Sequence, residues 1–461
     1  MMPCWSFVVV IMLLVATDIV QGFVQQQASI HHHHSKPHPG PLCASETDSL
    51  QSNNDNEHHT FNLPPGRPTN IFTRVLFDDT AKLLNPKDMK LLKRKQRFGS
   101  IFKTSFLLTP TVFITSKQGI ANMGKLEARN KDTFQAFFPP HHQKMFRPHS
   151  LLVQSGPNHS RIRSLVMSSL TPTVVKSYEP LVQASIQQFF EELRHQQEQQ
   201  EQSTSNHPYT KLVPKIRTLF TSIMLQVVLG TNNVADDLVE DLSIWAKGLV
   251  APPLTMFPFT TAGKAMKARA RVVDKLQQLM DDPESLQEDG LLKKLMNARD
   301  DENNTQLLHD EIIDNLFTLV FAGSDTTSAA ATSMCKTLTM HPDIRQALWT
   351  DHATDATTTM ETFVLQLLEA FPLAPFQMRQ TTKELEFEGY RIPKGWLVCC
   401  GYVSALWDEH APITVPSIRS SQTSSSDSDD DNNSSTHNTP AQSIAFGLGP
   451  RMCPGRFLAV S

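Results

Sequence analysis

A cysteine near the carboxyl end of the chain has neighbours suited to stabilising a thiolate. In residues 446–455, FGLGPRMCPG, Cys453 stands in a loop punctuated by Gly and Pro, and Arg451 lies two residues before it. A helical pattern, GRFLAV, begins directly after the loop, so backbone N–H groups and the helix dipole are expected to favour a negative sulfur. Such a cysteine is a nucleophile or a metal ligand. A nucleophile needs a His base, and His410 and His437 lie in or beside loops without an evident constraint.

A second polar cluster interrupts an apolar helical pattern over residues 314–334, DNLFTLVFAGSDTTSAAATSM. Gly323 in the middle of a helix costs about 1 kcal/mol relative to Ala. The neighbouring Ser and Thr hydroxyls can bend a helix by bonding back to its carbonyls. A core helix that bears this cost predicts a ligand against its backbone. A simple kink rich in Ser and Thr is the alternative when this stretch is considered alone.

The loop pattern Phe-Gly-x-Gly-x-Arg-x-Cys-x-Gly matches, at all six specified positions, the haem-binding loop of the cytochrome P450 family, and the chain resembles that family here. The resemblance implies that Cys453 is the metal ligand, the axial thiolate of haem iron. It also implies that Arg451 pairs with a haem propionate and that Phe446 packs beside the ligating loop. Three glycines would let the backbone turn tightly and approach the porphyrin of haem b: Gly447, Gly449 and Gly455. A buried, inert cysteine after a turn is the alternative.

The cluster at Ala322 to Thr327, AGSDTT, is similar to the distal oxygen-binding helix of the same family. The resemblance assigns two catalytic residues. Thr326 would hydrogen-bond dioxygen at the iron or an ordered water, and Asp325 would feed protons toward the distal oxygen.

Two further segments resemble propionate-binding parts of the family. His159 and Arg163 in LLVQSGPNHSRIRSLV match a helix that carries Trp or His followed four residues later by Arg. A spacing of four places both side chains on one helical face, where both could reach the propionates; a surface Arg and a His at a helix start are the alternative. Arg379 in PLAPFQMRQ stands where the family often has another arginine for a propionate.

The sequence predicts that the elements which position these residues are mainly helices with small β-sheets, so the fold class is α+β. Residues 97–115 predict a hairpin-like strand pair, and residues 384–400 predict another, turned by Pro393 to Gly395. Cys399 and Cys400 read as buried strand residues. The resemblance runs from about Leu63 to Phe457 and implies the cytochrome P450 fold. We expect that fold to be incomplete at the C-terminus, because relatives continue the last helix and add a sheet, whereas Ser461 is eight residues after Cys453.

The rest of the chain is divided by composition. Residues 1–24 contain an apolar run of twelve, Trp5 to Ala16, and predict a signal peptide or a signal-anchor. Residues 25–60 predict a disordered leader rich in His and Ser. The resemblance implies a cytochrome P450 domain over residues 61–461, in which composition predicts a disordered Ser/Asp-rich insertion at 420–440. These features favour the endoplasmic reticulum membrane. The alternative is a plastid, because VQGFV resembles the junction of a secretory-type plastid presequence.

One family feature is altered. The family has Glu-x-x-Arg before its Pro-rich turn, in an ion network with a later Arg, but Gln366 and Glu369 stand at the aligned positions. Arg419, the candidate for the later Arg, is one residue out of register. Breaking a buried ion pair costs about 3–5 kcal/mol, whereas replacing the whole set by uncharged residues can be nearly neutral.

The function that the resemblance implies is a haem-thiolate monooxygenase that inserts one oxygen atom from O₂ into a hydrophobic small molecule, such as a lipid, sterol or isoprenoid. Electrons would come from a separate NADPH reductase or ferredoxin, since no flavin- or ferredoxin-like segment is visible in the sequence. A formal charge of −4 gives no footprint for nucleic acid, and six cysteines without a Cys-x-x-Cys pair give no zinc site or disulfide framework. The alternatives are a degenerate, non-catalytic haem-binding protein and a haem-thiolate isomerase or dehydratase.

Overall fold

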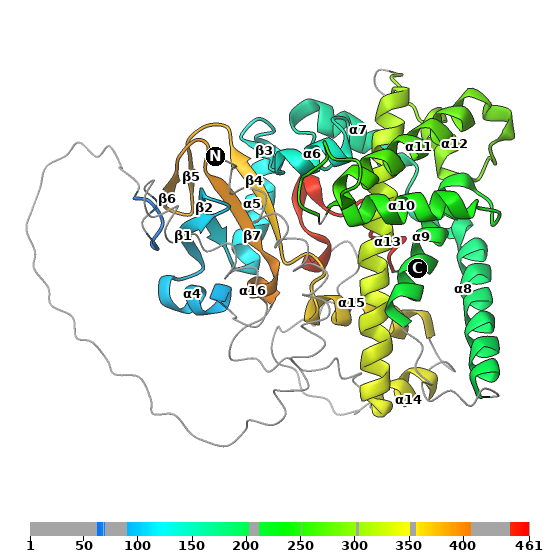
Figure 1. The fold of residues 1–461 in the computed structure, drawn as a ribbon. Coiled ribbons are helices and arrows are strands. Elements are labelled where there is room, and N and C mark those ends of the chain that lie inside the picture. Colours follow the sequence, from blue (N-terminus) through cyan, green and yellow to red (C-terminus); the bar gives the residue numbers. More distant parts are fainter. Residues whose placement is uncertain are drawn as a thin grey trace, which may run out of the picture.

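The computed structural model describes residues 62–67, 69, 90–201, 212–249, 251–300, 304–350, 356–406 and 443–460. The predicted signal segment, the predicted leader at residues 25–60 and the Ser/Asp-rich insertion lie outside these residues. Arg419 also lies outside them. The described part of the chain is rich in helices and has two small β-sheets, as predicted (Figure 1). Its α-helices are α4 (Lys90–Phe98), α5 (Lys117–Arg129), α6 (Pro140–Phe146), α7 (Gly156–Ser168), α8 (Pro172–Glu201), α9 (Leu212–Leu229), α10 (Asp236–Leu249), α11 (Thr261–Asp281), α12 (Leu291–Asn297), α13 (His309–Met340), α14 (Pro342–Thr350), α15 (Ala356–Ala370) and α16 (Tyr402–Leu406).

The strands form one mixed sheet and one separate pair. They are β1 (Ile101–Phe106), β2 (Thr109–Ile114), β3 (Phe134–Ala136), β4 (Phe376–Thr381), β5 (Leu385–Phe387), β6 (Tyr390–Ile392) and β7 (Leu397–Gly401). The larger sheet has the order β1-β2-β7-β4-β3, and β5 pairs only with β6. The β1–β2 hairpin confirms the strand pair predicted over residues 97–115. Cys399 and Cys400 in β7 are buried, as predicted.

The second strand pair forms, but the predicted position of its turn is wrong. β5 and β6 are joined at Glu388 and Gly389, which have φ of 46° and 78°, and not at Pro393 to Gly395. Positive φ at both turn residues gives the backbone twist that a two-residue hairpin needs. The segment from Pro393 to Gly395 instead leads the chain out of this pair and into β7, which pairs with β2 and β4.

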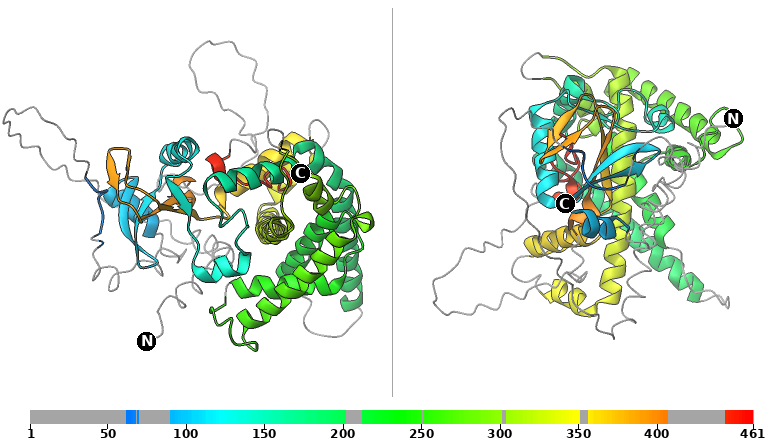
Figure 2. Two further views of the ribbon diagram at one scale, coloured as in Figure 1. Left: turned by 90° about the horizontal axis from the view of Figure 1, so that it is seen from above. Right: turned by 90° about the vertical axis from the view of Figure 1, so that its left-hand side faces the viewer.

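Helix α13 forms the centre of the helical part. It is 32 residues long, and Figure 2 looks down its axis in the view from above, with other helices arranged around it. Buried side chains of α7, α9, α10, α11 and α12 form one apolar core with those of α13. A second core joins the sheet to α5. The segment 443–460 is drawn between β7 and α13 in Figure 1, and Leu458 packs against the helical core.

Polar side chains of α13 hold the segment of residues 147–155, which leads into α7. Asp314 is completely buried, forms an ion pair with Arg147 and accepts a hydrogen bond of 2.9 Å from the backbone N–H of His149. Asn315 accepts a bond of 2.8 Å from the N–H of Leu151 and donates one of 3.0 Å to the carbonyl of His149. These contacts satisfy backbone groups of a segment that has no regular secondary structure.

Candidate functional site

The Cys453 loop is closed by backbone geometry. The N–H of Cys453 donates a hydrogen bond of 2.8 Å to the carbonyl of Phe446, and the turn between them contains Gly447 and Gly449 with φ of 77° and 74°. These angles favour glycine, as the sequence predicted for this loop. The cysteine itself is partly exposed.

The helix expected directly after Cys453 is absent from the described residues. Residues 454–460 form successive turns, with backbone hydrogen bonds from Ala459 to Gly455 and from Val460 to Phe457. Among the described residues, single groups and not a helix dipole act in favour of a negative sulfur. Burial raises the pKa of the Cys453 thiol, while the backbone N–H of Gly455 and the charges of Arg163 and Arg456 act in the opposite direction.

Two facing glycines fix the position of the Cys453 loop on α5. A Cβ atom at Gly449 would lie 2.8 Å from the Cα and 2.9 Å from the carbonyl oxygen of Gly124. A Cβ at Gly124 would meet backbone atoms of Gly449 and Leu448 at 3.3–3.4 Å. Backbone atoms cannot move aside as a flexible side chain can, so the loop and α5 require a glycine at position 449.

We expect Gly449→Ala to move the Cys453 loop away from α5 and to destabilise the fold by about 1–3 kcal/mol, because the new methyl group adds a clash to a strained φ. Gly395→Ala is the matched control, since Gly395 has φ of 82° but nothing within 4 Å of its Cβ position. Thermal unfolding and haem content of the two variants would measure the difference. Equal losses in both would show that the packing on α5 is unimportant.

Two predicted haem-binding residues, Arg379 and Arg451, share one buried carboxylate, and a third, Arg163, contacts the Cys453 loop. Arg379 Nε lies 2.9 Å and Arg451 Nε lies 3.3 Å from Oε1 of Glu127, a buried residue of α5. Arg163 Nη2 donates a hydrogen bond of 2.6 Å to the carbonyl of Met452, next to the candidate ligand. The sequence analysis missed Glu127, because one acid near the end of an amphipathic helix gives no signal without knowledge of what faces it.

Arg451 is also held by the segment that α13 fixes. Its Nη2 atom donates to the carbonyl of Gln154 at 2.7 Å and to Oγ of Ser155 at 3.2 Å. Burial and the nearby charge of Arg379 lower the pKa of Arg451 to about 10, so its guanidinium group remains charged at neutral pH.

His159 lies buried on α7 among these arginines, with Arg163 one helical turn further on. Burial and the charges of Arg451, Arg163 and Arg379 lower the pKa of His159 to about 3. Its imidazole is therefore neutral at physiological pH. The shared role of His159 and Arg163 in holding a propionate stays a prediction.

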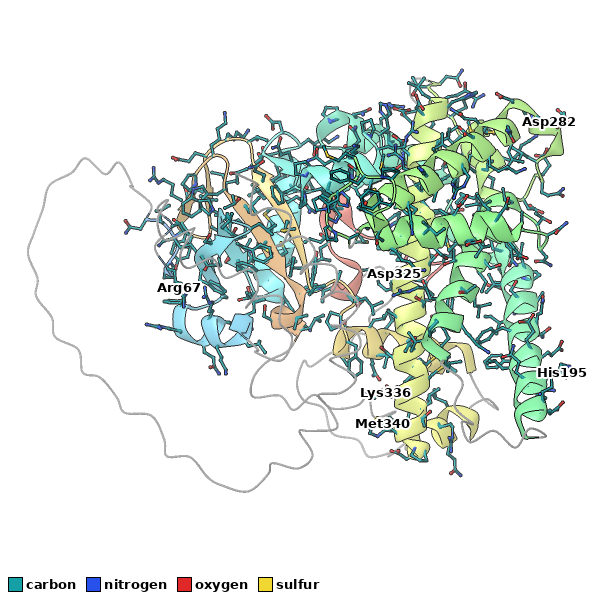
Figure 3. The ribbon with its side chains drawn as sticks, viewed as in Figure 1. Arg67, His195, Asp282, Asp325, Lys336 and Met340 are labelled. Atoms are coloured by element: carbon teal, nitrogen blue, oxygen red, sulfur yellow. The ribbon has the colours of Figure 1, made fainter. Side chains whose placement is uncertain are left out.

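Asp325 and Thr326 lie about half-way along α13, and Figure 3 labels Asp325 there. Thr326 is exposed although α13 runs through the centre of the helical part, and its hydroxyl donates to the carbonyl of Ala322 at 2.6 Å. Asp325 forms an ion pair of 3.2 Å with Arg217 of α9. Burial raises the pKa of Asp325, and the charge of Arg217 acts against that rise.

Close helix packing accounts for Gly323, and the expectation of a ligand against the backbone of residues 322–327 stays a prediction. A Cβ at Gly323 would lie 2.6 Å from the sulfur of Met224 and 2.8 Å from its Cε, so this glycine lets α9 pack closely on α13. The predicted back-bonding of hydroxyls is confirmed, since Ser324 Oγ donates to the carbonyl of Val320 at 2.6 Å, as Thr326 does to Ala322.

The altered Glu-x-x-Arg positions leave no uncompensated buried charge. Gln366 is exposed, and Glu369 is half-buried and accepts a hydrogen bond of 3.0 Å from the Ser443 hydroxyl. Ser443 also caps the short 3₁₀ helix that ends at Phe446. Glu369 thus supports the base of the Cys453 loop with a neutral partner, as the loss of the family's ion network at these positions allows.

The residues fit a flat, dianionic iron cofactor held by sulfur. The candidate ligand is partly exposed, a Cβ at Gly455 would have nothing within 4 Å, and every residue from Arg451 to Val460 is half-buried. Guanidinium groups suited to carboxylates surround His159 nearby. A metal ion at the sulfur would favour the thiolate, since a coordinating thiol is deprotonated.

A helix-rich fold with a small mixed sheet and this sulfur-and-arginine site define the class of haem-thiolate proteins. The chain belongs to the cytochrome P450 family, because the model described as "Cytochrome P450" matches residues 64–411. That match ends before the Cys453 loop, so the two lines of support are independent. The chain is therefore a cytochrome P450 monooxygenase.

Relatives support the same family. The chain is 28% identical to "Putative cytochrome P450 120" of Synechocystis sp. over 415 residues, 86% of this chain and 87% of that protein. It is 24% identical over 438 residues to "Abscisic acid 8'-hydroxylase CYP707A1" of Solanum lycopersicum, covering 88% and 84% of the two chains. Among solved structures, "Retinoic acid bound cyanobacterial CYP120A1" matches with a TM-score of 0.68 at 23% identity, over 87% of this chain and 91% of the other.

Proposed function

We propose that this monooxygenase hydroxylates an apolar small molecule of the isoprenoid, sterol or lipid class, with haem b bound through Cys453. Retinoic acid and abscisic acid, which the names of two similar proteins mention, are both isoprenoid carboxylic acids. The reaction would place one atom of O₂ in the substrate and the other in water, using two electrons and two protons. Electrons would come from a separate NADPH reductase or ferredoxin.

The observation that carries the proposal is that the sulfur-bearing Cys453 is partly exposed, and Thr326 of the central helix is exposed as well. Haem, when bound, supplies the oxygen chemistry. Arg451 and Arg379 would hold its carboxylates. Thr326 would hold a proton at Oγ1, and Asp325 would deliver protons to it from the side of Arg217.

An aromatic cluster beside this part of α13 supports an apolar substrate. Trp245 of α10 lies with its ring centroid 5.1 Å from Phe317 and 5.6 Å from Phe321, and Phe321 is 5.6 Å from Phe146 of α6. Phe321 is half-buried and directly precedes Ala322, to which Thr326 donates. Trp245, Phe317 and Phe146 are buried in the helical core, so Phe321 is the member of the cluster that could contact an apolar substrate.

The direct test is incorporation of ¹⁸O from labelled O₂ into retinoic acid, abscisic acid or a sterol by the purified protein with an added reductase or ferredoxin. The carbon monoxide complex of the reduced protein should show the far red-shifted Soret band of thiolate ligation. A protein with that band but no labelled product from any apolar substrate would favour the haem-thiolate isomerase or dehydratase. A protein without the band would favour the degenerate haem-binding alternative.

We expect Arg217→Gln to move the acidic limb of the pH–rate profile to higher pH. The substitution removes the positive charge that opposes the raised pKa of Asp325, so the carboxyl group stays protonated to a higher pH and cannot accept the next proton. The rate of product formation as a function of pH would measure the shift. Arg391→Gln, in the exposed pair of Arg391 with Glu384, should leave the limb in place. An unchanged limb in Arg217→Gln would remove Asp325 from the proton path.

Membrane association also belongs to the proposal, with the endoplasmic reticulum membrane as the site and a plastid as the alternative. The connection between α10 and α11 supports it, because Met256 is 79% and Phe259 is 74% exposed. Among the described residues, α9 alone is long and apolar enough to cross a membrane, and 44% of it is buried inside the protein.

Replacing both Met256 and Phe259 by Ser should weaken partition of the full chain into phosphatidylcholine vesicles by about tenfold or more, because each large apolar side chain gains about 1.5–3 kcal/mol on burial. Phe190→Ser on α8, where Phe190 is 57% exposed, is the matched control and should leave partition unchanged. The N-terminal apolar run is present in all three proteins, so the difference reports on the connection between α10 and α11. Equal partition of the parent and the double variant would contradict this membrane contact.

A further inference from the structure

One side-chain oxygen joins two strands of the larger sheet beside the candidate haem site. Oε1 of Gln377 in β4 accepts a hydrogen bond of 2.9 Å from the hydroxyl of Tyr402 and one of 3.3 Å from Nη2 of Arg379. Gln377 and Arg379 are two positions apart in one strand, so their side chains leave the same face of the sheet. Tyr402 directly follows β7, the strand that pairs with β4 (Figure 1). The three side chains therefore meet from two adjacent strands.

The same group lies against the turn that carries the candidate ligand. A Cβ atom at Gly447 would lie 3.3 Å from Nε2 of Gln377 and 3.3 Å from the hydroxyl of Tyr402, which leaves little room for a side chain. Gly447 follows the short 3₁₀ helix whose last carbonyl, that of Phe446, accepts the hydrogen bond of 2.8 Å from the N–H of Cys453. The amide and the hydroxyl thus support one side of the Cys453 loop.

The guanidinium group of Arg379 is held at all three of its nitrogens. Its Nε atom donates to Oε1 of Glu127 at 2.9 Å, its Nη1 atom donates to the carbonyl of Met378 at 2.9 Å, and its Nη2 atom donates to Gln377. A planar group held in this way cannot turn without breaking a bond. Arg379 is buried, so water replaces a broken bond poorly. Gln377 therefore fixes one corner of the arginine and stands between it and the Cys453 loop.

Tyr402 and Arg379 agree on one orientation of the Gln377 amide. Arg379 offers only N–H groups and therefore faces Oε1 and not Nε2. Tyr402 is 3% exposed, so its hydroxyl requires a partner within the protein, and it donates to the same oxygen. The Nε2 end of the amide is then turned toward Gly447. Loss of the Tyr402 hydroxyl removes one of the two constraints on this orientation.

We propose that Gln377 is a positioning residue for the haem-thiolate centre: its amide oxygen, oriented by Tyr402, sets the place of Arg379 relative to the turn before Cys453. This inference rests on the proposed binding of haem through Cys453. Arg379 would hold the carboxylates of the haem and Cys453 its iron, so a loose connection between the two would let the ligand loop open more often. Gln377 acts through these groups and is not a catalytic residue.

The test follows the red-shifted Soret band of the reduced, carbon monoxide-treated protein in dilute urea, below the concentration that unfolds it. We expect this band to be lost about tenfold faster in Tyr402→Phe, which keeps the ring but removes the hydroxyl bound to Gln377. Tenfold is the change in the loop-opening equilibrium that removal of one partner of a buried hydrogen bond produces. Gln377→Met keeps the length of the side chain without a strong acceptor and should give a similar increase.

A double variant, a conservative variant and a control separate positioning from general stability. Tyr402→Phe/Gln377→Met should lose the band no faster than either single variant, because both changes break the same contact. Gln377→Glu should keep the parent rate, because a carboxylate oxygen accepts both hydrogen bonds. Tyr178→Phe is the matched control, since Tyr178 is 2% exposed but its hydroxyl has no hydrogen-bond partner among the described residues. It should leave the rate unchanged.

A parent rate in Tyr402→Phe or Gln377→Met would overturn the inference. Multiplied effects in the double variant would do the same, as would a loss in Gln377→Glu as fast as in Gln377→Met. An equal rise in the rate of global unfolding, measured by tryptophan fluorescence, would also overturn it, because the contact would then only stabilise the fold. If Gln377→Met does not fold, Tyr402→Phe and Gln377→Glu decide between the outcomes.

The parent protein separates this inference from the proposed function. A parent that never shows the red-shifted band would overturn the proposed ligation of haem by Cys453 and this inference with it. A parent that shows the band while its variants keep the parent rate overturns only the role of Gln377.

Discussion

Cys453→Ser is expected to abolish the red-shifted Soret band of the reduced, carbon monoxide-treated protein and to lower product formation by more than about 100-fold. Changes to groups that merely support a metal ligand cost about 10–100-fold, so loss of the ligand itself should exceed that range. The serine hydroxyl keeps the size of the thiol but does not supply the electron density that favours O–O cleavage. Absorption spectra and labelled-oxygen incorporation would measure both effects.

Cys335→Ser is the matched control for this experiment. Cys335 is an exposed cysteine of α13 that takes no part in the site, so its replacement should leave the spectrum and the rate unchanged. A Cys453→Ser protein with the parent spectrum would show that another group binds the iron. The assignment of residues 446–455 as the ligand loop would then be wrong.

Asp314→Ala should destabilise the protein by about 3–5 kcal/mol, because it leaves the guanidinium of Arg147 without its buried partner and the N–H of His149 without an acceptor. Asp314 is completely buried, so water cannot take the place of the lost carboxylate. The free energy of unfolding in urea would measure the loss.

Glu384→Ala provides the comparison for Asp314. Glu384 and Arg391 lie 3.3 Å apart with side chains 54% and 50% exposed, and pairs of this kind contribute about 0–1 kcal/mol. Equal losses in the two variants would mean that Arg147 finds another partner or reaches water. The hold of α13 on residues 147–155 would then depend on Asn315, on the pair of Asp310 with Arg147 and on the bond of Thr318 with Ser150.

The parts of the fold that depend on local sequence patterns could be predicted from the sequence. The β1–β2 hairpin, the long helix α13 and the glycine-rich turn before Cys453 all follow from the spacing of apolar residues and glycines. The sequence predicts Arg451 and Cys453 as site residues from their spacing within residues 446–455. It predicts Arg163 from its spacing of four from His159 on one helix, and the structure places Arg163 against the carbonyl of Met452.

Contacts between distant segments could not be predicted in this way. Glu127 is 252 residues from Arg379 and 324 from Arg451, and nothing near it in the sequence marks it as their partner. Gly323 is a second case: Met224 on another helix packs against it, and nothing near Gly323 in the sequence marks that contact. The chemistry of these residues depends on which segment faces them, which a single sequence does not contain.

The pairing of β2 with β7 bears on how the chain reaches its native state. Thr111 in β2 is the register partner of Leu397 in β7, 286 positions later. Closing so long a loop carries a large entropic penalty, and such pairings form slowly. Helices α7 to α13 make most of their contacts with segments closer in sequence and can assemble first. The edge of β2 that pairs with β7 therefore stays unpaired during synthesis. That exposed edge makes newly made chains vulnerable to aggregation until β7 arrives, and chaperone dependence should be greatest in this interval.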